Sequence, residues 1–400
     1  MATIRERTWP NAKGVVQRRW QADFVDQDGT RRHKQFRLKK EADAWLSRAR
    51  ARVDAGTFMA ESASPTIGEA IDAWIARGEA KRRERTTIRQ RHQHKAHILA
   101  VLDADTRLAR ISTTRLEKAR DDLLLTHSLA TARKVVVSLR GILKQAKAVH
   151  LAPADLAIES DKRHKRRLEV GRDIPSPTEI DALVGAASGK GLALLCLAAF
   201  AGLSASELRG LRWADLKLGD DATVTISQRA DRWSEIGSPK SEARQRVVPL
   251  DETPAQALRA WKLAQPPITY DDAGEKRQRP ATLVFGTGAD KPDGLANIRR
   301  RVLEPIAIKA GVTVPALDAA GKPIKDKGGK PTVRPKYPGL HCLRHFAISS
   351  WLPICAGDFK LVQTWAGHAT LAMTLDRYGH LLPRKDGHKI MAAVQRNLFG

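Results

Sequence analysis

The sequence predicts a multidomain protein that is mainly α-helical and contains small β-sheets. Its 400 residues are enough for two or three domains of ordinary size. Apolar residues recur at helical spacing over several long stretches, whereas strand-favouring residues gather near the N-terminus and between residues 224 and 250. We expect three domains, at residues 1–60, 61–160 and 176–383, with a linker at 161–175 and a tail at 384–400.

The composition indicates a polyanionic partner. The chain has 70 Lys and Arg against 44 Asp and Glu, a formal net charge of +26 and a pI of about 10.4, which is typical of nucleic-acid-binding proteins. Its three cysteines, Cys196, Cys342 and Cys355, have no CxxC spacing and fit a reducing cytosol. The N-terminus has no apolar signal core, and the longest apolar run, residues 192–201, is too short to span a membrane. We expect a cytoplasmic protein associated with the bacterial nucleoid.

The first domain is expected to be a three-stranded sheet with one helix. Val, Trp and Phe are frequent in residues 15–25, Phe36 ends residues 31–36, and the intervening Asp28-Gly29 is a hairpin signal. A helix is expected from Lys40 to about Ala55, with Gly56 ending it.

The second domain is expected to be a helical bundle. Thr66 and Glu69 have capping-box spacing and begin an apolar stripe at helical period, and the apolar residues between 123 and 143 supply a core. A dense group of cations predicts one phosphate-facing side: Lys81, Arg82, Arg83, Arg85, Arg89 and Arg91.

The linker and the third domain follow. Residues 161–167 are too charged to pack and can track a DNA backbone through Lys162, Arg163, Lys165, Arg166 and Arg167. The third domain begins at a capping box, Ser176 and Glu179, with Pro177 at the first helical position. Helices lead to the strand-rich residues 224–250 and resume at about Leu340, and the Gly-, Lys- and Pro-rich residues 321–339 are expected to form a mobile surface loop.

Three motifs near the C-terminus carry the chemistry. His341 and Arg344 stand three apart in His-Cys-Leu-Arg-His, which places both on one helix face. Gly367-His368 follows, and then Tyr378 in Thr-Leu-Asp-Arg-Tyr-Gly-His. A phenol can displace an oxygen of a phosphodiester, and an arginine can form a fork onto the non-bridging oxygens.

Together these motifs resemble the active site of the tyrosine recombinases, in particular the integrase branch. The resemblance implies that Tyr378 forms a 3′-phosphotyrosine intermediate, aided by Arg344, His341 and His368, without ATP or metal. It also implies that Lys240, in the turn 237–241 before a strand, is the hairpin lysine that protonates the leaving oxygen.

The resemblance further implies double-stranded DNA as the partner. The bundle and the catalytic domain would clamp core-type sites, and the N-terminal sheet would bind arm-type sites through Arg18, Arg19, Arg31 and Lys34. Four protomers would assemble on DNA, the tail would dock on a neighbouring protomer, and an excision or directionality factor and a DNA-bending protein could assist.

One position departs from the family pattern. The family motif Gly-Leu-Arg-x-x-Glu-Leu appears here as residues 202–208 with Ser204 in place of the first catalytic arginine. Ser-x-x-Glu is also a capping box, so Ser204 can simply begin a helix. Losing one transition-state donor costs roughly 10²- to 10³-fold in rate. Arg209 and Arg212 lie on other faces of that helix, which argues against their replacing the arginine.

Three hypotheses remain open. The first is an active recombinase that integrates or excises a mobile element or prophage. The second is a DNA-binding protein of the same fold whose cleavage is impaired, with Ser204 either natural or introduced to stop the reaction. The third, a type IB topoisomerase, gives the arm-like N-terminal domain no use.

A zinc site is a further alternative, because several histidines and a cysteine lie close in sequence. No Glu follows His341 and no pair of cysteines has ligand spacing. We therefore expect no metal and no cofactor.

Overall fold

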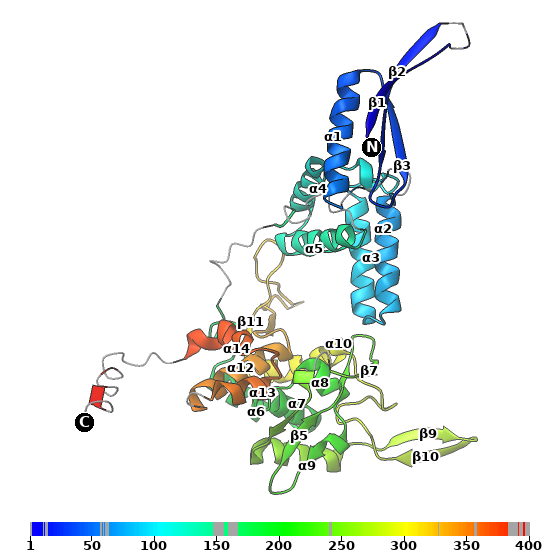
Figure 1. The fold of residues 1–400 in the computed structure, drawn as a ribbon. Helices are drawn as coiled ribbons and strands as arrows, with labels where there is room; N and C mark the ends of the chain where they lie inside the picture. The colour runs from blue at the N-terminus through cyan, green and yellow to red at the C-terminus, as the bar shows by residue number, and fades with distance from the viewer. Residues whose placement is uncertain are drawn as a thin grey trace. The chain divides into compact units, whose positions relative to one another are not determined.

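The computed structural model of this protein describes residues 2–10, 12, 15–56, 58, 60, 64–146, 156–158, 167–239, 242–326, 328–355, 358–382, 391 and 395–396. The described chain is mainly helical with small antiparallel sheets, as the sequence predicts (Figure 1). It divides into two compact units, residues 1–163 and 164–400. None of the described helices is long and apolar enough to cross a membrane.

The N-terminal sheet has the expected hairpin. Strands β1 (Thr3–Pro10), β2 (Val16–Val25) and β3 (Arg31–Phe36) pair antiparallel in that order, and α1 (Lys39–Asp54) packs against β2. The turn is closed by Asp26, whose carboxylate accepts the backbone N–H of Thr30 at 2.9 Å and pairs with Arg32 at 2.7 Å. The small core between sheet and helix contains Ala22, Phe24, Ala42, Leu46 and Ala49.

The helical bundle comprises α2 (Ile67–Ala80), α3 (Arg85–Leu99), α4 (Thr113–Thr126) and α5 (Leu129–Gln145), with a short 3₁₀ turn, η2 (Leu108–Arg110), between α3 and α4. The predicted capping box is present. Thr66 Oγ1 accepts the backbone N–H of Glu69 at 3.2 Å, and the Glu69 carboxylate accepts the backbone N–H of Thr66 at 2.8 Å. Helix α5 contributes most to the core, through Val135, Val136, Leu139, Ile142 and Leu143.

The C-terminal unit is built around α7. Its helices are α6 (Pro177–Ala186), α7 (Gly189–Ala199), α8 (Ala205–Gly210), α9 (Glu252–Ala264), α10 (Leu295–Ile298), α11 (Glu304–Lys309), α12 (Leu340–Ile354), α13 (Phe359–Ala366) and α14 (Leu371–Tyr378). Short helical turns add η5 (Trp213–Asp215), η6 (Glu242–Arg244), the π-helical η7 (Arg299–Leu303) and η8 (Gly379–Leu381). Helices α6, α8, α9 and α12 all contact α7. Because most of its surface is buried by these neighbours, α7 is apolar nearly all the way round.

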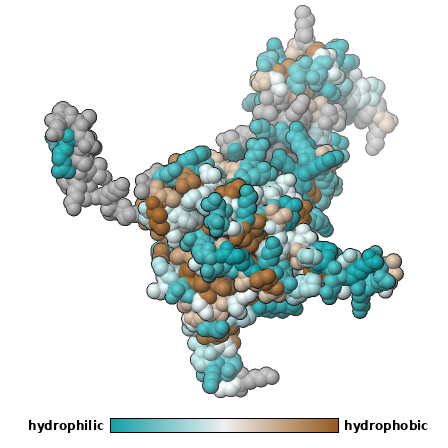
Figure 2. Space-filling model, turned by 90° about the horizontal axis from the view of Figure 1, so that it is seen from below, coloured by the Kyte–Doolittle hydropathy of each residue, from teal (hydrophilic) through white to brown (hydrophobic). Residues whose placement is uncertain are grey.

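Small sheets lie around these helices. Strands β4 (Leu216–Lys217), β5 (Thr223–Ile226) and β8 (Arg246–Pro249) form one sheet, and β6 (Arg229–Ala230) pairs with β7 (Ile236–Gly237), which confirms the strand-rich patch. Strands β9 (Ile268–Asp272) and β10 (Glu275–Arg279) form an exposed hairpin that Figure 2 shows as a mostly hydrophilic (teal) arm. Alternating hydrophobicity does not predict this hairpin, because charged side chains stand on both of its faces.

Residues 321–339 are more regular than the expected loop. Strand β11 (Thr313–Pro315) pairs with β12 (Val333–Pro335), and single bridges join residues 317 to 323 and 325 to 331. The turns are made by two similar Asp-x-x-Gly-Lys-Pro segments. In each, the Asp side chain, Asp318 or Asp326, accepts two backbone N–H groups at 2.9 Å, and the Gly, Gly321 or Gly329, has a φ of +77°.

Candidate active site

Helix α12 holds Arg344 in a fixed position. Leu343, Ala347 and Ile348 are buried beside it, and Arg344 itself is only 6% exposed. Its two terminal nitrogens donate to the backbone carbonyls of Gly202 and Ala366. The guanidinium thus joins α12 to the loop before α8 and to the end of α13. Burial lowers the pKa of Arg344, although arginine stays protonated in proteins.

A buried carboxylate joins the same elements. Glu207 of α8 is 2% exposed and forms two hydrogen bonds with Arg246 of β8, at 3.0 and 3.2 Å. It lies 3.9 Å from Arg344 and accepts the backbone N–H of Ser204 at 2.7 Å. Burial alone would raise the pKa of Glu207, but the Arg246 guanidinium and these hydrogen bonds lower it to about 2. Glu207 is therefore ionised and holds two arginines against the start of α8.

Ser204 is the N-cap residue of α8 and forms a capping box with Glu207, as the sequence predicts. Its hydroxyl lies 3.3 Å from that of Ser206 and carries no charge. Arg209 donates to the carbonyl of Asp231 at 2.6 Å and to Ser234 at 2.9 Å, while Arg212 binds Asp215 at 2.9 and 3.0 Å. Both guanidinium groups are thus held by other partners, in agreement with the expectation that neither replaces the arginine.

Tyr378 ends α14 with its side chain buried. It is 2% exposed, and its hydroxyl lies 2.6 Å from Nδ1 of His345 on α12. The ring of His368 stacks on the tyrosine ring at 6.4 Å between centroids. Burial raises the pKa of Tyr378 to about 12, against the opposing effect of the Arg344 and Arg377 charges. The phenol is therefore protonated at neutral pH, and acting as a nucleophile would require a proton acceptor.

The neighbouring histidines are neutral at pH 7. Burial, together with nearby positive charge, lowers the pKa of His345 to about 3 and that of His368 to about 4. A neutral His345 with its proton on Nε2 can accept the tyrosine proton at Nδ1. His368 is oriented by Thr374, whose hydroxyl lies 2.9 Å from its Nδ1. The site therefore places a neutral imidazole nitrogen within hydrogen-bonding distance of the tyrosine hydroxyl.

A cavity of about 720 Å³ adjoins these groups. Its polar lining includes His341, His345, three cations, Arg172, Arg299 and Arg377, and one carboxylate, Asp173, which pairs with Arg172 at 2.8 Å, so positive charge is in excess. Desolvation lowers the pKa of His341, and the charges of Arg344 and Arg377 lower it further. A cavity with this lining suits an anion, since neutral imidazoles can donate hydrogen bonds and the guanidinium groups supply charge.

Solved structures of DNA integrases have this fold. The chain is similar to the Tn1549 transposon integrase in complex with circular intermediate DNA, with a TM-score of 0.59 at 16% identity over 83% of this chain and 99% of that one. It is also similar to a lambda integrase tetramer bound to a Holliday junction, with a TM-score of 0.50 at 13% identity over 95% of this chain and 96% of that one. The chain has the tyrosine recombinase fold. No protein-family model and no curated protein matches the sequence.

Within this tyrosine recombinase fold, the structure brings most of the predicted site together. Tyr378 and His368 are stacked, His341 and His345 are in contact at 4.2 Å between ring centroids, and Arg344 lies one turn from His341. Lys240, the expected general acid, lies outside the described residues.

His345 contacts Tyr378 but is not among the site residues that the motifs predict. Its position four residues after His341 on one helix was the available signal, since that spacing places both rings on the same face. Its contact with Tyr378 could not be predicted from a local pattern, because the two residues are 33 apart in sequence.

The basic residues of the N-terminal sheet divide between its two faces. Lys34 is paired with Ala22 on the face that packs against α1, and its ammonium lies 6.0 Å from the centroids of the Phe36 and Trp45 rings. Arg18 is on that same face by alternation, whereas Arg19 and Arg31 stand on the opposite face. The two pairs therefore do not form one surface.

The bundle cations are mostly exposed. Lys81, Arg82, Arg83, Arg85 and Arg89 are accessible to solvent. Arg91 differs, because its guanidinium stacks on the ring of Trp74 at 4.0 Å and donates to the carbonyl of Trp74. In the linker, Arg167 is exposed, and the other predicted contacts, Lys162, Arg163, Lys165 and Arg166, lie outside the described residues.

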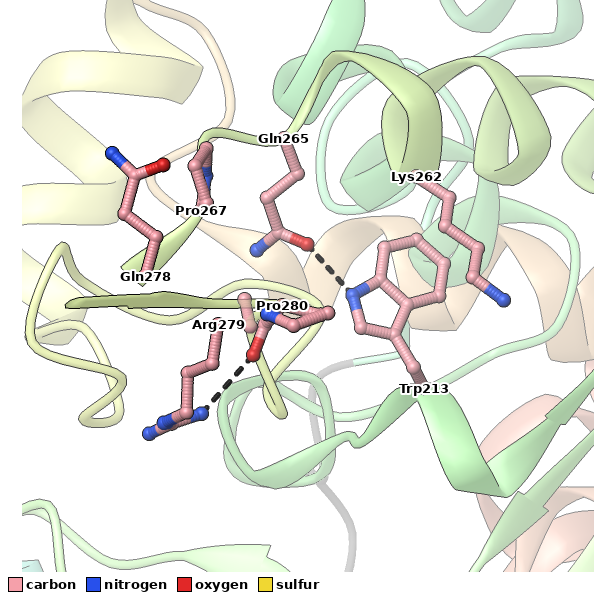
Figure 3. A pocket seen from close by; sticks show the side chains of 8 residues that line it. Trp213, Lys262, Gln265, Pro267, Gln278, Arg279 and Pro280 are labelled. Atoms are coloured by element: carbon pink, nitrogen blue, oxygen red, sulfur yellow. Dashed lines mark hydrogen bonds between the residues drawn. The ribbon is translucent and has the colours of Figure 1, made fainter. Parts of the chain in front are cut away.

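A second pocket, of about 410 Å³, lies at the base of the β9–β10 hairpin (Figure 3). Trp213, Lys262 and Arg279 line it, and Trp213 Nε1 donates to Gln265 at 2.6 Å. None of the predicted catalytic residues lines this pocket. It does not belong to the candidate active site.

Proposed function

We propose that this chain is a site-specific tyrosine recombinase of the integrase type, which cuts and rejoins DNA to integrate or excise a mobile element or prophage. The observation that carries the proposal is the 2.6 Å contact between the buried Tyr378 hydroxyl and Nδ1 of His345. The likeness to two integrases whose structures contain DNA supports it.

In the proposed cleavage step, Tyr378 Oη attacks the phosphorus of a DNA phosphodiester. The P–Oη bond forms, the P–O5′ bond breaks, and the phenol proton passes to Nδ1 of His345. The freed 5′-oxygen takes up a proton, for which Lys240 is the proposed donor. Arg344 and His341 stabilise the non-bridging oxygens as charge develops on them. Arg344 has five N–H groups, and its hydrogen bonds to the carbonyls of Gly202 and Ala366 use two of them. The others are the proposed donors to the phosphate.

Rejoining reverses these steps on a different strand. A 5′-hydroxyl attacks the phosphotyrosine and gives its proton to Lys240. The P–O5′ bond forms, the P–Oη bond breaks, and the tyrosine oxygen recovers its proton from His345. One phosphate ester is exchanged for another in each step, so the energy of the phosphodiester bond is kept. The proposed reaction therefore uses neither ATP nor a metal ion.

The proposed DNA contacts follow the charge. The exposed cations of the bundle, Lys81 to Arg89, would bind core-type sites, and Arg18, Arg19, Arg31 and Lys34 would bind arm-type sites. Four protomers would assemble on two sites, with the tail at 384–400 docking on a neighbour. Apart from residues 391, 395 and 396, that tail lies outside the described part of the chain.

A covalent adduct tests the proposal. The protein is incubated with a pool of nicked DNA duplexes of randomised sequence and run on a denaturing gel. A band of protein joined to DNA is expected, and Tyr378→Phe is expected to remove it. An adduct of equal yield with Tyr378→Phe would refute the assignment of the nucleophile.

Ser204 favours a second candidate function, a DNA-binding protein of this fold whose cleavage is impaired. Adduct formation by Ser204→Arg but not by the unmodified chain would support this candidate. The fold and the site assignment would then stand, and the chain would bind sites without cutting them.

A further inference from the structure

The uncharged Ser204 raises the question of which group neutralises the phosphate in its place. Four arginines near α8 and α12 are engaged by protein groups: Arg209, Arg212, Arg246 and Arg344. Arg246 is the most constrained of these, since it binds Glu207 twice and donates to the carbonyl of Trp365 at 2.6 Å. Moving Arg209, Arg212 or Arg246 to a phosphate would break these hydrogen bonds, whereas Arg344 already has its own proposed role at the phosphate.

Arg244 differs from these four. It ends the short turn η6, is partly exposed, and its guanidinium has no hydrogen bond or ion pair to any residue that the structure describes. An unpaired guanidinium can turn toward an anion without losing a protein partner. Its five N–H donors match the geometry of a phosphate.

The backbone of η6 places Arg244 beside the candidate active site. The carbonyl of Arg244 accepts a hydrogen bond from Arg246 Nη1 at 3.1 Å, and the same nitrogen donates to Glu207 at 3.0 Å. Glu207 in turn binds the backbone N–H of Ser204 at 2.7 Å. A short chain of hydrogen bonds thus connects the backbone at Arg244 to the position that lacks its arginine.

The other side of η6 lies against the turn that carries His368. A Cβ atom built on Gly367 would lie 3.2 Å from the carbonyl oxygen of Ala243. Residue 367 has no side chain, so the turn can approach this closely. The charge of Arg244 also helps to lower the pKa of His368, after burial and the charge of Arg344, and it has a smaller effect in the same direction on the pKa of Arg344.

We propose that Arg244 supplies the cationic contact to the transferring phosphate that Ser204 cannot supply. This inference rests on the proposed recombinase function. Arg244 would approach the phosphate from the η6 side and bind its non-bridging oxygens, while Arg344 binds them from α12. Charge neutralisation would thus come from a different element of the same fold.

The test measures the rate of adduct formation on a nicked duplex recovered from the randomised pool. Arg244→Gln is expected to lower this rate roughly 10²- to 10³-fold, the usual effect of losing one transition-state donor. Arg277→Gln, which removes an arginine from the exposed β10 strand, is the control and is expected to leave the rate unchanged. The double variant Ser204→Arg/Arg244→Gln is expected to recover most of the lost rate, because an arginine returns to the family position.

Three outcomes would overturn the inference. The first is an Arg244→Gln rate within about threefold of the unmodified chain, well below the effect expected of a lost transition-state donor. The second is a double variant no faster than Arg244→Gln. The third is an adduct from Ser204→Arg but none from the unmodified chain, since Arg244 would then not compensate.

Failure of this inference can be told apart from failure of the proposed function. A Tyr378→Phe variant that still forms the adduct would remove the recombinase mechanism itself. An inactive Tyr378→Phe variant together with an active Arg244→Gln variant would remove only the role of Arg244. Because the described contacts of Arg244 are made by its backbone, Arg244→Gln is expected to unfold at the same temperature as the unmodified chain, which a melting curve checks.

Discussion

Replacing Glu207 by Gln should strongly destabilise the C-terminal unit. The variant keeps the shape of the side chain, but it replaces one of the two acceptor oxygens by an amide donor and leaves Arg246 and Arg344 buried without a counter-charge. The pKa of Glu207 falls from its ordinary 4.5 to about 2 in the folded protein. Since a tenfold change in proton affinity corresponds to about 1.4 kcal/mol, the charged form contributes about 3 kcal/mol at pH 7. This value agrees with the cost of breaking a buried ion pair in other proteins, which is about 3–5 kcal/mol.

The effect should depend on pH in a defined direction. Because folding lowers the pKa of Glu207, its contribution is complete above the ordinary value of 4.5 and is lost as the pH falls toward 2. The variant lacks the contribution at every pH. The difference in unfolding free energy between the two proteins should therefore be largest near pH 7 and should narrow below pH 4.5.

Urea and thermal unfolding of the full chain measure this effect. A loss of about 3 kcal/mol should lower the melting temperature of a unit of this size by roughly 6–12 °C. Glu304→Gln is the control, because Glu304 pairs with the exposed Arg299 at 3.1 Å at the surface. That pair should contribute no more than about 1 kcal/mol. A folded Glu207→Gln variant that loses less than about 1 kcal/mol would refute the reasoning, because a broken buried pair costs more.

Three further predictions concern the groups around Tyr378. His345→Gln should slow adduct formation by about 10²- to 10⁴-fold, the usual contribution of a general base; His380→Gln, which removes only a 2.8 Å contact to the carbonyl of Leu168, should not. Gly367→Ala should destabilise the C-terminal unit by about 1–3 kcal/mol in urea unfolding, because φ is +62° and the new Cβ would lie 2.9 Å from Arg246 Nη1; an unchanged midpoint would argue against the tight packing of η6. Stability should fall as the pH drops below 6.5, because His345 and His368 are buried neutral while the unfolded chain takes up protons. Each of the two histidines should lower the free energy of unfolding by about 1.4 kcal/mol per pH unit until the pH reaches its pKa in the folded protein. The loss of stability in acid should therefore be smaller in His345→Gln.

The sequence by itself determined the features that depend on neighbouring residues. The Asp28-Gly29 hairpin and the capping boxes at Thr66, Ser176 and Ser204 are confirmed, because turns and helix starts are satisfied within a few residues of chain. The placement of His341 and Arg344 on one helix is confirmed for the same reason.

Only the tertiary structure decided which distant groups meet. The contacts of His345 with Tyr378 and of Glu207 with Arg246 join residues 33 and 39 apart, and Arg91 turns from the expected DNA face onto Trp74. The position of Arg244 likewise depends on η6 packing against the glycine before His368. Periodicity and spacing describe one segment at a time, whereas these contacts depend on how several segments pack together and share buried charge.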